Sequence, residues 1–174
     1  MMRTIHFKAI IATSVAAVFS LGVSGLSAAN AQSAINSFAG FERGGSGFHS
    51  NSVYEKGVAH IEAGEYEQAI EYLEIFERPG FYGPNQADYA LGLAQAGAKN
   101  WRKAERPLKQ TVRFNPDNHH ARYLLGLTYA NLGRIDRAQR QLTKLDARLA
   151  DCGDNCDTSL ISSAEALRDL LPEN

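Results

Sequence analysis

Small and apolar residues recur along this chain with a period longer than a single helix. Three segments align when Ala69, Ala104 and Ala138 are superimposed, at spacings of 35 and 34 residues. Each alanine has a glycine twelve residues before it, a large apolar residue three before it and a leucine four after it. These columns are Gly57, Gly92 and Gly126, then Tyr66, Trp101 and Ile135, then Leu73, Leu108 and Leu142. Such a period predicts a stacked array of helix pairs, each burying its apolar face only against its neighbours.

The chemistry of the columns fits two antiparallel helices packed closely together. Glycine and alanine are small where the helix axes approach, and the large apolar residues fill the space between units. The pairs Leu91-Gly92 and Leu125-Gly126, with Pro116 ending the second unit, resemble the tetratricopeptide repeat. The resemblance covers about Asn51 to Ala150 and implies an all-α solenoid. We therefore expect three helix-turn-helix repeats over residues 51–157.

Three departures from the repeat pattern predict local irregularity. The second helix of the first unit should end at Arg78, because Pro79-Gly80 and an enlarged loop follow. Lys99 replaces the glycine expected between the helices of the second unit. Pro107 falls about two turns into a helix, where proline costs ~3 kcal/mol and kinks the axis. We expect irregular curvature in the middle of the array.

The segments on either side of the array differ in pattern. Residues 158–174 carry apolar side chains at helical spacing, which predicts a capping helix and tail that cover the last unit. These apolar positions are Leu160, Ile161, Ala164, Leu167 and Leu171. Residues 32–50 are rich in glycine and serine and predict a flexible leader. Its Phe38, Phe41 and Phe48 either dock on another surface or are isolated linker aromatics.

Residues 1–31 have the pattern of a signal peptide. Arg3 and Lys8 precede an uncharged apolar run, and Ala29 and Ala31 supply the small residues that a signal peptidase requires. We expect cleavage after Ala31 and a periplasmic or secreted protein; an uncleaved membrane anchor is the alternative. Removing these 31 residues and their two cations leaves 143 residues with 16 Lys and Arg against 19 Asp and Glu, a charge of −3. That balance gives no reason to expect nucleic acid, since basic residues such as Arg134, Arg137 and Arg140 are interleaved with acids or spread around a helix.

The only two cysteines stand four positions apart, at Cys152 and Cys156. Gly153 is suited to the left-handed conformation that ends a helix, after which Cys156 folds back. In an oxidising compartment this arrangement predicts a disulfide across a five-residue ring, worth ~2 kcal/mol on the chain-entropy model. It would hold the corner between the array and the capping helix.

Two other roles for the cysteines remain open but less favoured. A zinc site needs four ligands, and His119-His120 is the only adjacent imidazole pair. A redox pair normally has two intervening residues and a basic neighbour, whereas the acids around these thiols would raise their pKa. We expect no metal and no cofactor.

Catalytic motifs are lacking, but the repeats form regular columns on their first helices. A tyrosine precedes each glycine by three residues and an aliphatic residue follows it. By resemblance to the tetratricopeptide family, these columns line the inner, concave side of the array. The candidate groove residues are Asn51, Tyr54, Val58, Gln86, Tyr89, Leu93, His120, Tyr123, Leu127 and Asn131. The alternative is that the tyrosines are common packing residues of such repeats.

These expectations combine into a hypothesis of function. We predict a non-enzymatic, exported protein–protein interaction module that binds a peptide or protein segment in its concave groove. Family members that clamp a C-terminal carboxylate use Lys and Asn in the inner columns; this chain lacks that set, so we do not expect that ligand class. We expect no membrane span after cleavage. The alternative is a structural or assembly subunit of an envelope complex that acts through self-association, and the sequence leaves the oligomeric state undecided.

Overall fold

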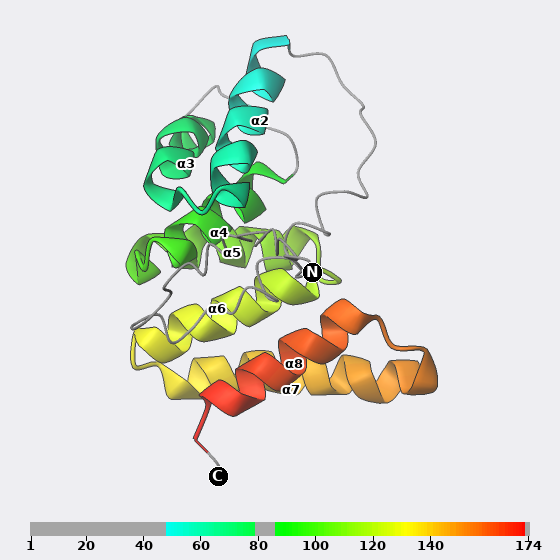
Figure 1. Cartoon of the computed structure of the whole chain (residues 1–174). Coiled ribbons are helices and arrows are strands. Elements are labelled where there is room, and N and C mark those ends of the chain that lie inside the picture. Colours follow the sequence, from blue (N-terminus) through cyan, green and yellow to red (C-terminus); the bar gives the residue numbers. More distant parts are fainter. Residues whose placement is uncertain (1–47, 79–85, 173–174) are drawn as a thin grey trace, which may run out of the picture.

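The computed structural model describes residues 48–78 and 86–172, and the regular elements of these residues are helices. The α-helices are α2 (Phe48–Glu62), α3 (Tyr66–Leu73), α4 (Ala87–Gly97), α5 (Trp101–Phe114), α6 (His119–Asn131), α7 (Ile135–Cys152) and α8 (Thr158–Leu170). Two short 3-10 helices, η1 (Glu74–Glu77) and η2 (Gly153–Asn155), follow α3 and α7. Figure 1 shows the helices stacked in layers from α2 and α3 at one end to α7 and α8 at the other.

Successive helices form three pairs, α2 with α3, α4 with α5, and α6 with α7, and each pair packs on the next. The last helix, α8, packs on both α6 and α7. This arrangement confirms the predicted all-α solenoid of three helix-turn-helix repeats with a capping helix at its C-terminal end.

The glycine column marks the places where helices come into contact. A methyl group added at Gly57 would lie 2.6 Å from Leu73 Cγ, and one at Gly92 would lie 2.7 Å from Leu108 Cγ. Each leucine belongs to the same unit as the glycine it contacts, and both leucines are fully buried. Each glycine therefore admits the leucine of its own second helix.

The third unit departs from this rule. A methyl group at Gly126 would lie 2.6 Å from Cδ2 of Leu167 on α8, which is nearer than any atom of Leu142, the leucine of its own unit. Leu167 is fully buried, as are Ala164 and nearly all of Leu160 on the same helix. The capping helix thus inserts its apolar face against the first helix of the last unit.

The turns within the three pairs share one backbone conformation. Gly64 has a φ of 77° and Gly133 a φ of 71°, and Lys99 at the equivalent place has a φ of 60°. A left-handed conformation suits glycine, which has no Cβ, and costs energy for other residues. The second unit therefore keeps the turn of its neighbours in spite of its lysine.

The ends of the second helices agree in part with the sequence. α3 gives way to η1, and Arg78 follows with extended φ and ψ of −77° and 139°, where the helix was expected to end. The enlarged loop after it lies outside the described residues. α5 contains Pro107 without interruption, and the proline is fully buried. The irregular curvature expected there stays a prediction.

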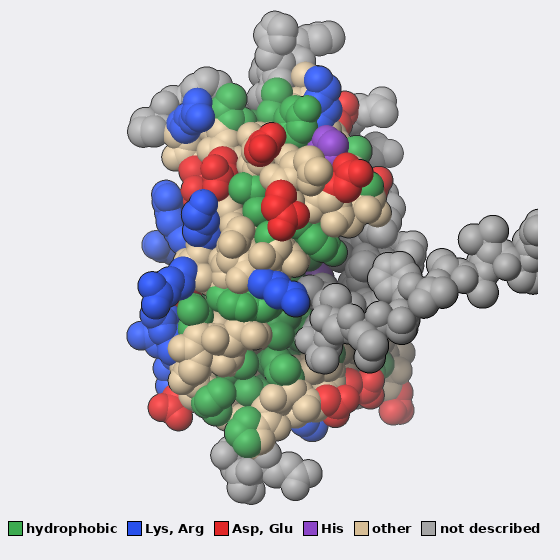
Figure 2. Space-filling model, turned by 60° about the vertical axis from the view of Figure 1, so that its left-hand side comes forward, with side chains coloured by type: hydrophobic (Ala, Val, Ile, Leu, Met, Phe, Trp, Pro, Cys, Tyr) green, Lys and Arg blue, Asp and Glu red, His purple; other side chains and the backbone are tan. Residues whose placement is uncertain are grey.

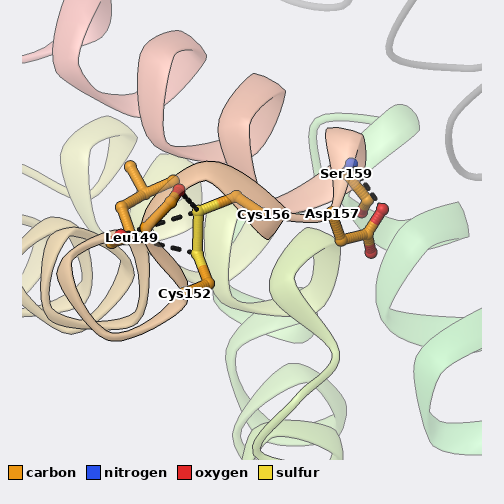
Figure 3. Close-up of a disulfide and its surroundings, with 6 residues drawn as sticks. Leu149, Cys152, Cys156, Asp157 and Ser159 are labelled. Atoms are coloured by element: carbon orange, nitrogen blue, oxygen red, sulfur yellow. Dashed lines mark hydrogen bonds between the residues drawn. A yellow bond between two sulfur atoms is a disulfide. The ribbon is translucent and has the colours of Figure 1, made fainter.

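A disulfide links Cys152, the last residue of α7, to Cys156, with 5.1 Å between their Cα atoms. Both sulfur atoms lie beside the carbonyl oxygen of Leu149, at 3.4 and 3.5 Å (Figure 3). Gly153 ends α7 with φ 58° and ψ −127°, a conformation that glycine adopts readily. Asp157 then caps α8, since its Oδ1 accepts a hydrogen bond from Ser159 N at 3.1 Å.

The start of the array needs one correction. Helix α2 begins at Phe48, so residues 48–50 belong to a helix and not to the flexible leader that the sequence predicted for residues 32–50. The predicted signal peptide, with Phe38 and Phe41 of the leader, lies outside the described residues. Among the described helices, none is long and apolar enough to cross a membrane.

Candidate binding face

The ten candidate groove residues come from the first helices of the three units or their N-terminal ends. Asn51, Tyr54 and Val58 lie on α2; Gln86 is the N-cap of α4, which carries Tyr89 and Leu93; His120, Tyr123, Leu127 and Asn131 lie on α6. We call the side of the array that these helices share the inner face. The repeat spacing places equivalent side chains at the same position of each helix.

Hydrogen bonds join the tyrosine column to the polar column of the following unit. The Tyr54 hydroxyl donates to Gln86 Oε1 at 3.3 Å. One unit further, Tyr89 Oη lies 2.8 Å from His120 Nδ1. The two contacts span 32 and 31 residues and use the same pair of repeat positions. Each tyrosine therefore reaches across the boundary between two units.

Aromatic contacts extend this row into the third unit. The rings of Tyr89 and His120 meet edge to face with centroids 6.1 Å apart, and the ring of Tyr123 is 5.7 Å from that of His120. Edge-to-face and tilted pairs are favourable arrangements for aromatic rings. The imidazole thus contacts a tyrosine of its own unit and a tyrosine of the unit before it.

Exposure differs strongly along the inner face. Five candidates are buried, namely Tyr89, Leu93, His120, Tyr123 and Leu127. Tyr54, Val58 and Gln86 are partly buried, while Asn51 and Asn131 are exposed. The interunit hydrogen bond gives Tyr89 a packing role, which is the alternative that the sequence left open. The accessible candidates lie mainly in the first unit and at the end of α6.

Burial shifts the pKa values of the groups in this row. Loss of solvation lowers the pKa of His120 to about 4 and raises that of Tyr89 above its ordinary value. Both side chains are therefore neutral near pH 7, whichever of the two donates the proton they share. His120 Nε2 is also buried and has no hydrogen-bond partner among the described residues. A second proton, placed on Nε2, would make the imidazole cationic and would find no acceptor among the described residues.

The adjacent histidines His119 and His120 have different surroundings. His120 points to Tyr89, whereas His119 is half-buried and its pKa is lowered mainly by loss of solvation. In residues 48–78 and 86–172, no three His, Cys, Asp or Glu side chains are grouped to hold a metal ion.

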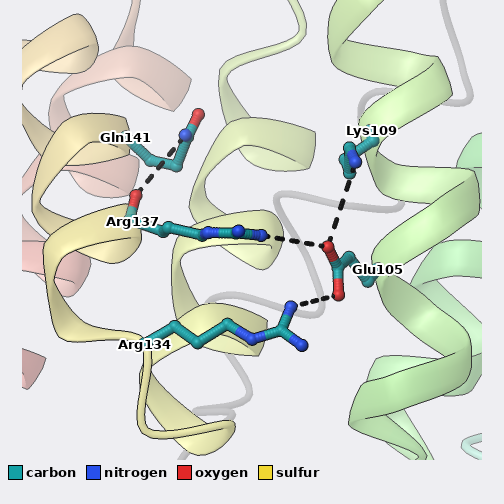
Figure 4. Close-up of polar contacts among 5 residues, drawn as sticks. All are labelled: Glu105, Lys109, Arg134, Arg137 and Gln141. Atoms are coloured by element: carbon teal, nitrogen blue, oxygen red, sulfur yellow. Dashed lines mark hydrogen bonds and ion pairs between the residues drawn. The ribbon is translucent and has the colours of Figure 1, made fainter.

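The second helices carry a network of ion pairs that the sequence pattern did not predict. Glu105 on α5 contacts Arg134 at 2.6 Å and Arg137 at 3.7 Å on the neighbouring unit, and Lys109 at 3.9 Å on its own helix (Figure 4). Pairs from Glu74 to Lys103 and from Glu77 to Arg106 join the first unit to the second. Most partners are well exposed, so each pair contributes little to stability.

The basic side chains also gather on one side of the molecule. In Figure 2 Lys and Arg lie along one edge, over the middle and lower layers, while acidic side chains are more frequent above them and at the lower end. Arg134 and Arg137 pair with Glu105, in line with the expected interleaving with acids. The other expectation, that the cations are spread around a helix, was wrong for α5 and α7, where they follow one side. The spacing of these cations in the sequence, three and four residues, could have revealed the row, because residues at this spacing lie on one side of a helix.

Models of the tetratricopeptide repeat match residues 54–105 and 93–156, which together span all three units. The chain belongs to the tetratricopeptide repeat family. This confirms the predicted resemblance, and it makes the chain a member of a family of protein–protein interaction modules. No curated protein sequence matches the chain.

A solved structure supports the fold of this tetratricopeptide array independently. The crystal structure of PcrH in complex with the chaperone binding region of PopB is similar to it, with a TM-score of 0.58 and 15% sequence identity. The similarity covers 75% of this chain and 100% of that chain. At this identity the match establishes the helical architecture.

Proposed function

We propose that this chain is a non-enzymatic interaction module whose inner face binds an extended or helical segment of another protein. The observation that carries the proposal is the repeated interunit bond, Tyr54 to Gln86 and Tyr89 to His120. These bonds hold the inner side chains of consecutive units in fixed relative positions. A binding surface that is already ordered costs less conformational entropy when a ligand binds.

The accessible part of the inner face suits an amphipathic segment. Val58 and the ring of Tyr54 offer apolar contact, and the side-chain amides of Asn51, Gln86 and Asn131 offer donors and acceptors. A few rigid aromatic or aliphatic anchors surrounded by polar groups are typical of protein interfaces. PcrH, in complex with the chaperone binding region of PopB, provides a precedent for such binding by a protein of this architecture.

We further propose that the protein is exported to the periplasm or the exterior. The pattern of residues 1–31 supports this, and so does the bond between Cys152 and Cys156, because disulfides persist in oxidising compartments.

Site-specific photocrosslinking in the cells that make the protein tests the proposed face. A photoreactive amino acid is placed at the exposed inner positions Asn51 and Asn131, and at the exposed control positions Glu71 on α3 and Glu165 on α8. We expect adducts to one other protein from the inner positions only. Adducts from the control positions alone would refute the inner face as the binding site.

The same experiment addresses the alternative role in self-association. If the inner positions crosslink mainly to a second copy of this chain, the array assembles with itself and the proposal of a separate partner fails. A monodisperse monomer by light scattering, together with adducts to a different protein, is the result that the proposal requires.

A further inference from the structure

The outer surface of α5 and α7 carries two rows of cations. On α5 the row is Arg102, Arg106, Lys109 and Arg113, at intervals of four, three and four residues. This spacing follows one side of a helix, and the buried residues Ala104, Leu108 and Thr111 lie on the opposite side. The first row therefore points away from the core.

The second row lies on α7 and borders the first. It consists of Arg137, Arg140, Lys144 and Arg148, at intervals of three, four and four residues. Arg137 contacts Glu105 on α5, and Arg148 contacts Asp117 just after α5, at 2.6 Å. These contacts, one at each end of the row, show that the row lies on the side of α7 that faces α5. We call the two rows together the basic strip.

The middle of the basic strip lacks acidic partners. Glu105 forms ion pairs at the end near Arg134, and Asp117 forms an ion pair at the end near Arg148. Between them, Arg113, Arg140 and Lys144 are exposed and form no ion pair with any described residue. Phe114, next to Arg113, is 73% exposed and lies beneath that guanidinium, 5.5 Å from it.

Rows of like charge at this spacing oppose helix formation. Each pair of like charges four residues apart destabilises an isolated helix by about 0.2–0.5 kcal/mol. The strip contains such pairs at Arg102 with Arg106, Lys109 with Arg113, Arg140 with Lys144, and Lys144 with Arg148. An anionic ligand laid along the strip would remove this repulsion. Arginine in particular offers planar sets of donors that match carboxylate groups.

The boundaries of the strip restrict the size of that ligand. The first unit presents glutamates on α3 and η1, and the opposite end of the array presents the acids Asp151, Asp154, Asp157, Glu165 and Asp169. The helix α5 has 14 residues, or about 21 Å at 1.5 Å per residue. A nucleic acid or a flat anionic membrane that covered more of the array than this strip would meet the acidic side chains of the layers on both sides of it. A short acidic segment would not.

We propose that the basic strip of α5 and α7 is a second binding surface, which takes a short acidic segment of a protein. The segment's carboxylates pair with Arg113, Arg140 and Lys144, and an apolar side chain beside them packs on Phe114. This surface is separate from the inner face, because its residues lie on the second helices. It stands or falls independently of the function proposed above.

Binding to a defined probe tests the strip. The probe is a fluorescein-labelled peptide of about twelve residues that alternates glutamate and serine, with one central leucine. Its affinity for the full-length chain is measured by anisotropy at about 150 mM salt, where surface charges are already partly screened. The strip variant Arg113→Gln/Arg140→Gln/Lys144→Gln removes three cations, and the control variant Lys56→Gln/Arg78→Gln/Lys99→Gln removes three cations elsewhere. Both variants have the same net charge, and circular dichroism checks that both remain folded.

We expect the strip variant to weaken peptide binding at least tenfold and the control variant to change it less than twofold. Phe114→Ala should weaken binding of this probe, with less effect on a probe in which serine replaces the leucine. Equal losses in both triple variants, or no binding by the native chain, would overturn the proposal. Tighter binding to a single-stranded oligonucleotide or to vesicles with one-third phosphatidylglycerol, lost in the strip variant, would also overturn it in favour of those ligands.

Discussion

The hydroxyl of Tyr89 lies 2.8 Å from Nδ1 of His120, a buried contact between the second and third units. The equivalent contact one unit earlier joins Tyr54 to Gln86. At the same repeat position, a histidine in one unit and a glutamine in another are each the hydrogen-bond partner of the tyrosine of the preceding unit. Only the histidine is ionisable, which makes one unit boundary sensitive to pH.

The first prediction follows from this difference. Burial lowers the pKa of His120 from 6.5 to about 4, so the unfolded chain binds this proton more readily than the folded one. Stability is fully present above pH 6.5 and falls as the pH is lowered towards 4. The limiting loss is about 3 kcal/mol, because each pKa unit corresponds to about 1.36 kcal/mol.

Urea denaturation from about pH 7.5 to 4 checks this loss in the native chain and in His120→Gln. The variant places a glutamine opposite Tyr89, as Gln86 lies opposite Tyr54. It should lose much less stability on acidification. If both proteins lose the same amount over this range, titration of His120 does not control the boundary between the second and third units.

The second prediction concerns the capping helix. Gly126→Ala places a methyl group within 2.6 Å of Leu167 and should destabilise the protein by about 1–3 kcal/mol through overpacking. Leu167→Ala alone leaves a cavity and should cost about 2–5 kcal/mol. The double variant should cost less than the sum, since Leu167→Ala removes the atoms that the new methyl group would meet and the methyl group partly fills the cavity. Strict additivity in thermal denaturation would contradict direct contact between α6 and α8.

Lys99→Gly is expected to stabilise the protein. The lysine has a φ of 60° at a turn where the other two units have glycine. The strain energy that glycine removes from the folded state is larger than the conformational entropy that it adds to the unfolded chain. We expect the free energy of unfolding to rise by about 0.5–1 kcal/mol. Lys99→Ala, which removes the same charge but keeps a Cβ, is the control and should give no gain. A lower melting temperature for the glycine variant would show that the lysine side chain has a stabilising contact.

Reduction of the disulfide is expected to lower the melting temperature by several degrees. The ring between Cys152 and Cys156 contains five residues, and its closure contributes ~2 kcal/mol on the chain-entropy model. Cys152→Ala/Cys156→Ala should melt at the lower temperature with or without reductant. Detection of two free thiols in unfolded, unreduced protein from its own cells would contradict the bond.

Much of the fold could be predicted because it depends on local spacing. The glycine and alanine columns fix where helices approach, and Gly64 and Gly133 mark the turns. The contact of Gly126 with Leu167 could not be predicted, because the repeat offered Leu142 as the equivalent neighbour. The capping helix has no counterpart in the repeat, so its register depends on tertiary packing alone.

The sequence predicted which residues occupy equivalent positions in the three units, but it did not predict the contacts between those residues. Tyr89 and His120 were both placed on the inner face, but the bond between them depends on how far one unit is rotated against the next. The basic strip was missed for a different reason. Net charge and the order of neighbours in the sequence do not reveal it, because the row from Arg102 to Arg113 becomes visible only at the helical spacing of three and four.

The measurement that tests the account most directly compares two matched variants of the inner face and the cap. Val58→Glu puts a charge at a partly buried inner position, and Ile161→Glu does the same on α8, where the isoleucine is 37% exposed. The protein trapped by the photocrosslinker at Asn51 is quantified in cells for each variant. The account predicts at least a tenfold loss of this adduct for Val58→Glu, with Ile161→Glu within twofold of the native chain and both variants folded. An undiminished adduct in Val58→Glu, or an equal loss in both, would show that the inner face does not bind the partner.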